Sequence, residues 1–159
     1  AMRLATARPR RIYIATAEAR DDEMRERIAR HQRERDGTWS TVEEPTDLAA
    51  AIAANDADDI PIMVDCLTLW LPNLMAAERD VHAATADLIA ILPRLHANVV
   101  FVSNGVGLGI IPANALARAF RDAQGSLNQA VASAVDHVDF VAAGLALNMK
   151  PGLPSGQTA

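Results

Sequence analysis

The residues of this 159-residue chain whose types suit phosphate chemistry are a glycine-rich loop, a strand-end aspartate and a histidine among arginines. The loop follows a short apolar strand, which we predict over residues 99–103, and contains Asn104, Gly105, Gly107 and Gly109. Ligands of α/β proteins usually bind beyond the carboxyl ends of strands, and glycines let the backbone approach them closely. We therefore expect Asn104 and Gly107 to lie at a ligand site.

Asp65 closes a second apolar strand, which we predict over residues 60–65. A carboxylate at the tip of such a strand can hold Mg²⁺, directly or through water, opposite a phosphate loop. It can equally cap the helix that begins near Leu67. The local sequence leaves both roles open.

His31 lies on a predicted helix over residues 22–35, for which Asp21 or Asp22 provides the N-cap. A neutral imidazole on this helix could attack an α-phosphorus and form a phosphoramidate, while Arg27 and Arg30 stabilise the phosphates. The alternative is a solvated, salt-bridged helix face on which the histidine has no chemical role.

Short strands and helices alternate along the rest of the chain, which indicates a parallel sheet covered on both faces. The predicted strands span residues 12–16, 60–65, 99–103 and 138–142, with 146–149 placed to pair beside the last, and residues 39–42 are expected to form a short extended piece. The other predicted helices span residues 47–54 (capped by Thr46), 67–77 (disturbed by Pro72), 83–95 and 114–134.

Length and composition limit the classes of protein to which the chain can belong. The length fits one domain over residues 1–150, with the end of a helix at 1–7 and a disordered tail at 151–159. A net charge of -5 argues against a general nucleic-acid binder. The single cysteine, Cys66, cannot form an internal disulfide, no apolar run reaches about 18 residues, and no signal-peptide core is visible. We expect a cytoplasmic protein without a membrane span.

Several motifs occur in an order that resembles one enzyme family. They are Tyr13-Ile-Ala-Thr-Ala17, Asp21-Asp-Glu-Met24, Arg27-Ile-Ala-Arg-His31, Trp39-Ser-Thr-Val-Glu-Glu-Pro45, Asp65-Cys-Leu-Thr-Leu-Trp70 with Asn73-Leu74, Val106-Gly-Leu-Gly-Ile-Ile-Pro112, and Leu116-Ala-Arg-Ala-Phe-Arg-Asp122 with Gly125 and Asn128-Gln129. Together they resemble the bifunctional adenosylcobinamide kinase/adenosylcobinamide-phosphate guanylyltransferase family of cobalamin biosynthesis, over nearly all of residues 1–150.

The resemblance implies a P-loop NTPase fold of the RecA-like type, with three layers and a mostly parallel sheet, assembled as a homo-oligomer. It implies two reactions: phosphorylation of adenosylcobinamide by ATP or GTP, and transfer of GMP from GTP to adenosylcobinamide phosphate. It makes His31 the residue that takes up GMP covalently. It also places Asp65 near Mg²⁺ and the triphosphate, and Arg27, Arg30, Asn104 and Gly107 around the nucleotide.

The chain also departs from the family pattern. The family begins with a strand and a Gly-x-x-x-x-Gly-Lys-Ser phosphate loop, whereas residues 1–5 resemble the middle of the helix that follows that loop. A missing N-terminus, a late assigned start and a degenerate relative are the three explanations. Gly105 and Ala113 replace two usual glutamates, and Pro72 a common threonine. The rival hypothesis is therefore a non-catalytic nucleotide- or corrinoid-binding protein or partner subunit. If these residues were the whole natural chain, we would expect neither reaction at a useful rate.

Overall fold

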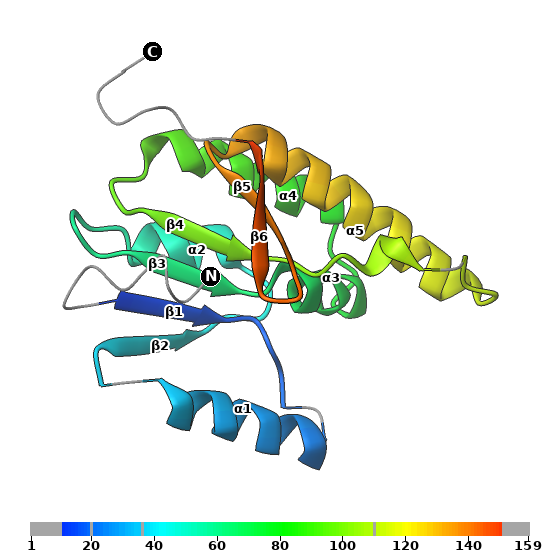
Figure 1. Ribbon diagram of the computed structural model, residues 1–159, viewed down its shortest axis with the longest axis horizontal. Coiled ribbons are helices and arrows are strands. Elements are labelled where there is room, and N and C mark those ends of the chain that lie inside the picture. Colours follow the sequence, from blue (N-terminus) through cyan, green and yellow to red (C-terminus); the bar gives the residue numbers. More distant parts are fainter. Residues whose placement is uncertain (1–10, 20, 36, 110, 151–159) are drawn as a thin grey trace.

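The computed structural model describes residues 11–19, 21–35, 37–109 and 111–150. The helix end expected over residues 1–7 and the tail expected over 151–159 lie outside the described residues. Four parallel strands form the central sheet in the order β2-β1-β3-β4 (Figure 1). They are β1 (Arg11–Ala15), β2 (Trp39–Glu43), β3 (Ile62–Asp65) and β4 (Val99–Val102). The predicted parallel α/β architecture is confirmed.

The strand predicted to begin at Ile60 begins two residues later, at Ile62. Pro61 has no N–H to donate to a neighbouring strand. Its carbonyl instead accepts a 3.0 Å hydrogen bond from the Ile12 N–H, and the Ile60 N–H turns back to the Ala57 carbonyl. The proline therefore marks where the turn ends and the sheet begins.

Five helices and two short 3-10 turns connect the strands within the described part of the chain. The helices are α1 (Asp22–Glu34), α2 (Leu48–Ala54), α3 (Leu67–Ala76), α4 (Val81–Ile91) and α5 (Ala115–Ala134), and the turns are η1 (Leu92–Arg94) and η2 (Val106–Leu108). Of the two predicted caps, it is the Asp21 carboxylate that caps α1, by accepting from the Met24 N–H at 2.7 Å. Pro72 lies inside α3, which continues through it.

Two predicted helix boundaries are wrong. Thr46 does not cap α2, because the Glu44 carboxylate accepts from the backbone N–H groups of Thr46 and Asp47. The cap is Asp47, whose side chain accepts from the Ala50 N–H. The helix predicted over residues 83–95 begins at Val81 after an Asp80 cap, and its last turn becomes the 3-10 turn η1, which contains a proline.

The alternation of side chains along the strands divides the molecule into layers. Ile12, Ile14, Ile62 and Val64 point from one face of the sheet into the core that α2, α3, α4 and α5 cover. The core is aliphatic apart from Trp70, and its other fully buried helix residues include Leu48, Ile52, Leu67, Leu71, Leu74, Leu88 and Leu127. The intervening strand residues, among them Tyr13 and Met63, point to the opposite face of the sheet.

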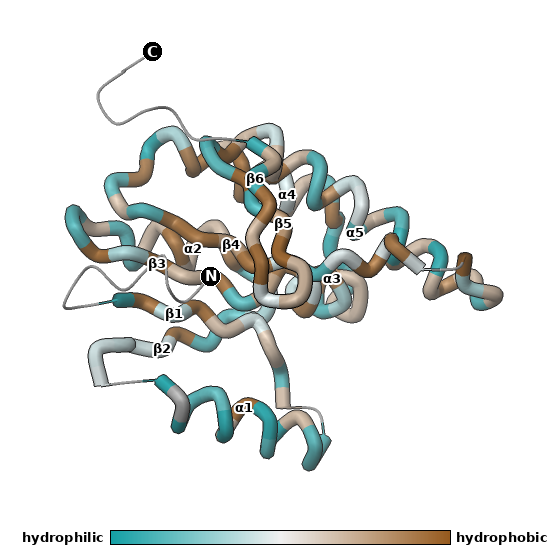
Figure 2. The backbone as a smooth tube through the Cα atoms, viewed as in Figure 1, coloured by the Kyte–Doolittle hydropathy of each residue, from teal (hydrophilic) through white to brown (hydrophobic). Residues whose placement is uncertain are grey.

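The strand predicted over residues 138–142 does not join the parallel sheet among the described residues. β5 (Val138–Ala142) pairs antiparallel with β6 (Leu145–Lys150) in a separate two-stranded hairpin. The turn residues Ala143 and Gly144 both have positive φ, which suits the right-handed twist of a tight hairpin. The hairpin stays apolar along much of its length (Figure 2), and Leu145 is 76% exposed.

No helix in the described ranges is both long enough and apolar enough to cross a bilayer.

Candidate active site

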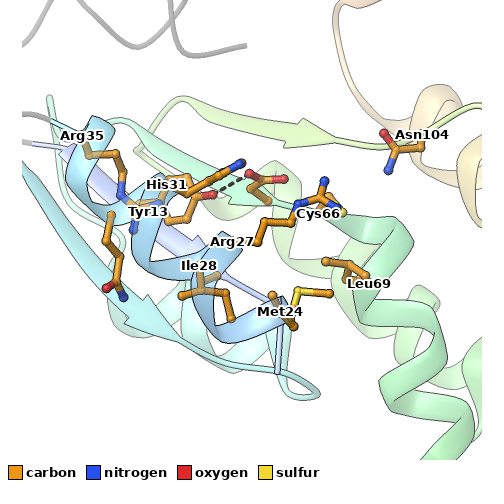
Figure 3. Close-up of a pocket in the computed structure, with 13 residues that line it drawn as sticks. Tyr13, Met24, Arg27, Ile28, His31, Arg35, Cys66, Leu69 and Asn104 are labelled. Carbon is orange, nitrogen blue, oxygen red and sulfur yellow. Dashed lines mark hydrogen bonds between the residues drawn. The ribbon is translucent and has the colours of Figure 1, made fainter. Parts of the chain in front are cut away.

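A pocket of about 230 Å³ lies between α1 and the carboxyl ends of β1 and β3 (Figure 3). Its walls come from four places in the chain: the odd-numbered residues of β1 and the loop after it, one face of α1, the junction of β3 with α3, and the loop after β4. The lining residues are Tyr13, Ala15, Ala17, Met24, Arg27, Ile28, His31, Gln32, Arg35, Asp65, Cys66, Leu69 and Asn104. This is the edge of a parallel sheet at which ligands usually bind.

The helical period explains which residues of α1 reach the pocket. Met24, Ile28, His31 and Arg35 follow one another at intervals of three or four residues, so they lie on one face of the helix. In Figure 3 the side chains of this face extend toward the strand ends. The two apolar members, Met24 and Ile28, are half-buried and lie on the same face as the histidine.

Asp65 holds its predicted place at the carboxyl end of β3, where it is partly buried. The Tyr13 hydroxyl donates a 2.5 Å hydrogen bond to its Oδ2 atom. The parallel register pairs Tyr13 with Met63 and Ala15 with Asp65, so the side chains of Tyr13 and Asp65 point to the same face of the sheet. Burial, together with the hydrogen bond to Asp65, raises the pKa of Tyr13, so the phenol stays protonated and remains the donor.

Arg35 lies over the ring of Tyr13, with its guanidinium carbon 3.8 Å from the ring centroid. The ring of Trp39 meets Tyr13 edge-on, with 6.1 Å between centroids and an interplanar angle of 88°. Arginine binds aromatic faces through cation–π attraction, and edge-to-face rings are a favourable pair. The tyrosine is therefore held from two sides as well as at its hydroxyl.

Buried hydrogen bonds hold the two strand ends together beneath the pocket. The Thr16 hydroxyl donates to the Cys66 carbonyl and accepts from the Cys66 N–H, both at 2.8 Å. The Asn73 amide donates to the Thr16 carbonyl at 2.7 Å and to the Pro45 carbonyl at 3.2 Å. Burial raises the pKa of the Cys66 thiol, so it stays protonated and is a poor nucleophile.

The structure brings four of the predicted site residues together: Arg27, His31, Asp65 and Asn104 all line the pocket. Arg30 is exposed and is not among the lining residues, because it is about a third of a helical turn from the centre of the inward face. Arg30 therefore lies outside this pocket, and its predicted role in binding phosphate stays a prediction.

Gly107 is likewise not among the pocket residues. It lies in η2 and is exposed, and a Cβ atom placed on it would meet nothing within 4 Å. The protein itself therefore does not require a glycine there. The loop is attached to the site by Asn104, whose N–H donates to the Thr68 hydroxyl of α3 at 2.8 Å.

Tyr13 and Arg35 are among the pocket residues that the sequence did not predict as site residues. The signal for Arg35 was its position four residues after His31, with Met24 and Ile28 on the same face. The contact of Tyr13 with Asp65 depends on the pairing of β1 with β3, and local sequence patterns do not reveal which strands pair. Gln124 was missed as well: it is fully buried in α5, and its amide nitrogen donates to Ser103 at 3.1 Å and to Asn128 at 2.9 Å.

The donor chemistry of the pocket fits Mg²⁺ bound together with a triphosphate. No group of three or more His, Cys, Asp or Glu side chains gathers into a metal cage in the part of the chain that the structure describes. Mg²⁺ is usually bound by one or two carboxylates, with water and substrate phosphates completing the shell. Asp65, a carboxylate at the pocket wall, matches that arrangement.

Comparison with known proteins decides the family. Residues 1–149 match the model of the CobU family, described as cobinamide kinase / cobinamide phosphate guanyltransferase. The chain belongs to the CobU family. The fold is therefore that of a P-loop NTPase-like α/β family, as the motifs predicted.

Two curated members of the CobU family are similar over most of their length. The bifunctional adenosylcobalamin biosynthesis protein CobP of Pseudomonas aeruginosa is 40% identical over 140 residues, which are 87% of this chain and 81% of the relative. The bifunctional adenosylcobalamin biosynthesis protein CobU of Salmonella typhimurium is 38% identical over 157 residues, covering 89% of this chain and 87% of the relative. The family predicted from the ordered motifs is confirmed.

Proposed function

We propose that this protein phosphorylates adenosylcobinamide with a nucleoside triphosphate, ATP or GTP, and then transfers GMP from GTP to adenosylcobinamide phosphate through His31. The observation that carries the second reaction is that His31, Asp65 and two arginines line one pocket at the carboxyl edge of the sheet. Membership of the CobU family supports the pairing of the two reactions. A nucleophile, an acid at a strand tip and cations are the groups that nucleotidyl transfer needs.

The transfer proceeds in two displacements at the α-phosphorus. An unprotonated ring nitrogen of His31 attacks the α-phosphorus of GTP, and the N–P bond forms while the bond to the pyrophosphate oxygen breaks. A phosphate oxygen of adenosylcobinamide phosphate then attacks the same phosphorus. The N–P bond breaks, His31 is regenerated, and the product is adenosylcobinamide-GDP.

Two arginines stabilise the charge that moves during these steps. Arg27 on α1 and Arg35 at its C-terminal cap both line the pocket, one before and one after His31 in the chain. Planar guanidinium groups donate to phosphate oxygens in pairs, so each can hold a nonbridging oxygen in place. We thus replace the predicted pair Arg27 and Arg30 with Arg27 and Arg35.

Asp65 is the residue that would hold Mg²⁺ in this proposal. When bound, the ion supplies charge neutralisation for the triphosphate oxygens. The carboxylate orients it from the end of β3, while Tyr13 holds the carboxylate.

Intact-protein mass spectrometry after incubation with GTP and Mg²⁺ tests the proposal. We expect an acid-labile increase of one GMP unit in the wild-type protein and none in His31→Ala. His82→Ala is the matched control, because His82 is exposed on α4 and is not a lining residue of the pocket. A folded wild-type protein that forms no adduct, or an adduct that persists in His31→Ala, contradicts the proposal.

Self-association is a further part of the proposal. Large apolar side chains are exposed on the loop before α5 and at its start, with Leu108 79%, Ile111 66% and Leu116 68% exposed. Clustered exposed apolar residues mark interaction surfaces in soluble proteins. Light scattering after size-exclusion chromatography should give a mass above that of the 17.0 kDa chain, and Leu116→Glu should lower it. A monomer at all concentrations would contradict this part.

A further inference from the structure

Tyr13 reaches the proposed metal carboxylate from a neighbouring strand. Its hydroxyl donates to Oδ2 of Asp65 at 2.5 Å, and the residue is only 6% exposed. In the parallel register Asp65 pairs with Ala15 of β1, and Tyr13 precedes Ala15 by two residues. To reach Asp65, the Tyr13 side chain therefore extends along β1 toward the carboxyl end of the strand. The geometry joins the middle of β1 to the tip of β3.

The hydroxyl has little freedom to move away from the carboxylate. Arg35 covers one part of the ring at 3.8 Å from its centroid, and Trp39 packs edge-on against it. A phenol has only two side-chain torsions, so these contacts determine where its oxygen lies. The ring thus provides a rigid donor, in contrast to a serine hydroxyl, which can rotate.

We propose that Tyr13 is the positioning residue for Asp65: its hydroxyl occupies Oδ2 and thereby orients the other carboxylate oxygen toward Mg²⁺ and the nucleotide. The inference rests on the proposed metal role of Asp65, and not on the role of His31. A carboxylate has about four lone-pair sites, so one donor on Oδ2 leaves others for a cation or its bound water. Partners that orient metal ligands in this way change metal affinity about 10–100-fold when they are removed.

A second explanation is that the hydrogen bond only satisfies a buried phenol. The two explanations differ in what Tyr13→Phe does. A merely structural hydroxyl would alter nucleotide binding equally with and without metal. A positioning hydroxyl would alter only the part of the binding that depends on the metal.

The test compares GDP binding in Mg²⁺ with GDP binding in EDTA, using a fluorescent GDP analogue and the whole chain. The ratio of the two dissociation constants measures the contribution of the metal. We expect Asp65→Asn to abolish this contribution and Tyr13→Phe to reduce it about tenfold or more. Thr85→Val is the control, because it removes a buried hydroxyl that bonds the Val81 carbonyl within α4 and does not line the pocket; its ratio should equal that of the wild type.

Three results would overturn the inference: a wild-type ratio in Tyr13→Phe, an unchanged ratio in Asp65→Asn, or no metal dependence in the wild-type protein. Thermal melting of each variant shows that the comparison is made on folded protein. Failure of the proposed function is seen separately, as a missing GMP adduct on His31. If no adduct forms but Tyr13→Phe still reduces the effect of Mg²⁺ on GDP binding, the proposed function is wrong and this inference holds.

Discussion

The N–H of Asn104 donates a 2.8 Å hydrogen bond to the hydroxyl of Thr68, joining the loop after β4 to the first turn of α3. Thr68 is buried and follows the pocket residues Asp65 and Cys66 by two or three positions. The bond therefore fixes the position of the Asn104 loop relative to the carboxyl end of β3.

Thr68→Val removes this acceptor while keeping the shape of the side chain. We expect a loss of about 1 kcal/mol in the free energy of unfolding, since the Asn104 N–H loses its partner. We also expect faster hydrogen exchange over residues 104–109 and a higher KM for GTP with little change in kcat. Hydrogen-exchange mass spectrometry and steady-state kinetics measure these effects.

Thr85→Val is the matched control for that variant. Thr85 is as buried as Thr68, but its hydroxyl donates to the Val81 carbonyl within its own helix. Its replacement should leave exchange in the 104–109 loop unchanged. Equal exchange in both variants would show that the Thr68 bond does not restrain the loop.

Three of the arginines of α1 and its C-terminal cap, Arg27, Arg30 and Arg35, should differ in their effect on guanylyl transfer according to their position. Arg27→Gln and Arg35→Gln should each lower kcat/KM for guanylyl transfer about tenfold or more, because each removes a cation from the pocket wall. Arg30→Gln should stay close to the wild type, since Arg30 is exposed and is not a lining residue.

Initial rates of His31 labelling with GTP measure this difference. A loss in Arg30→Gln as large as that in Arg27→Gln would mean that the phosphates bind on a different face of α1. Since Arg35 also covers the ring of Tyr13, Arg35→Gln should in addition reduce the metal dependence of GDP binding.

The arginine-rich helix α1 shows which structural features local sequence can predict and which it cannot. The helix and its two candidate caps, Asp21 and Asp22, follow from short-range rules, and the structure confirms the helix with Asp21 as the cap. Arginines occur at so many positions on this helix that charge alone does not say which of them faces inward. The apolar residues Met24 and Ile28 identify the inward face, because apolar side chains mark the buried face of a helix.

Tyr13 and the hairpin show what local sequence does not contain. Tyr13 acquires its partner 52 positions away through strand pairing, which depends on how the whole sheet assembles. The strands predicted near residues 138 and 146 do form, yet they pair with each other instead of joining the parallel sheet in the described structure. Strand propensity is local, whereas strand order is determined by tertiary packing.

Asn73 should matter for stability more than for chemistry. It is 6% exposed on α3, and its amide bonds the Thr16 and Pro45 carbonyls in the loops after β1 and β2. Asn73→Ala would leave these carbonyls without this donor and open a small cavity. We expect a loss of about 2–3 kcal/mol in the free energy of unfolding.

Urea unfolding followed by circular dichroism measures the effect of Asn73→Ala. Gln129→Ala is the control, because Gln129 is exposed on α5, and such surface changes stay within about 0.5 kcal/mol. Similar midpoints for the two variants would mean that the buried amide contributes nothing.

The pair formed by His96 and Asp56 should make stability depend weakly on pH. Nδ1 of His96 lies 3.0 Å from the Asp56 carboxylate, which also accepts from the backbone N–H groups of His96 and Ala97 and joins the turn after α2 to the turn before β4. The hydrogen bond with Asp56 and its negative charge raise the pKa of His96 above its usual 6.5, while the bonds from His96 and Ala97 lower the pKa of Asp56.

The direction of the pH effect follows from these two shifts. The raised pKa of His96 means that its contribution is fully present below about pH 6.5 and is lost as the pH rises through the folded-state pKa. The lowered pKa of Asp56 means that its contribution is present above its unfolded-state pKa and is lost only as the pH falls through the lower folded-state value.

Melting temperatures of the wild type and His96→Gln should therefore differ most near about pH 5.5 and converge by about pH 9. The side chain of His96 is 68% exposed, so the difference should be small and should shrink in about 1 M salt. A difference that is constant across pH would show that the imidazole charge plays no part, and that the backbone bonds to Asp56 alone join the two turns.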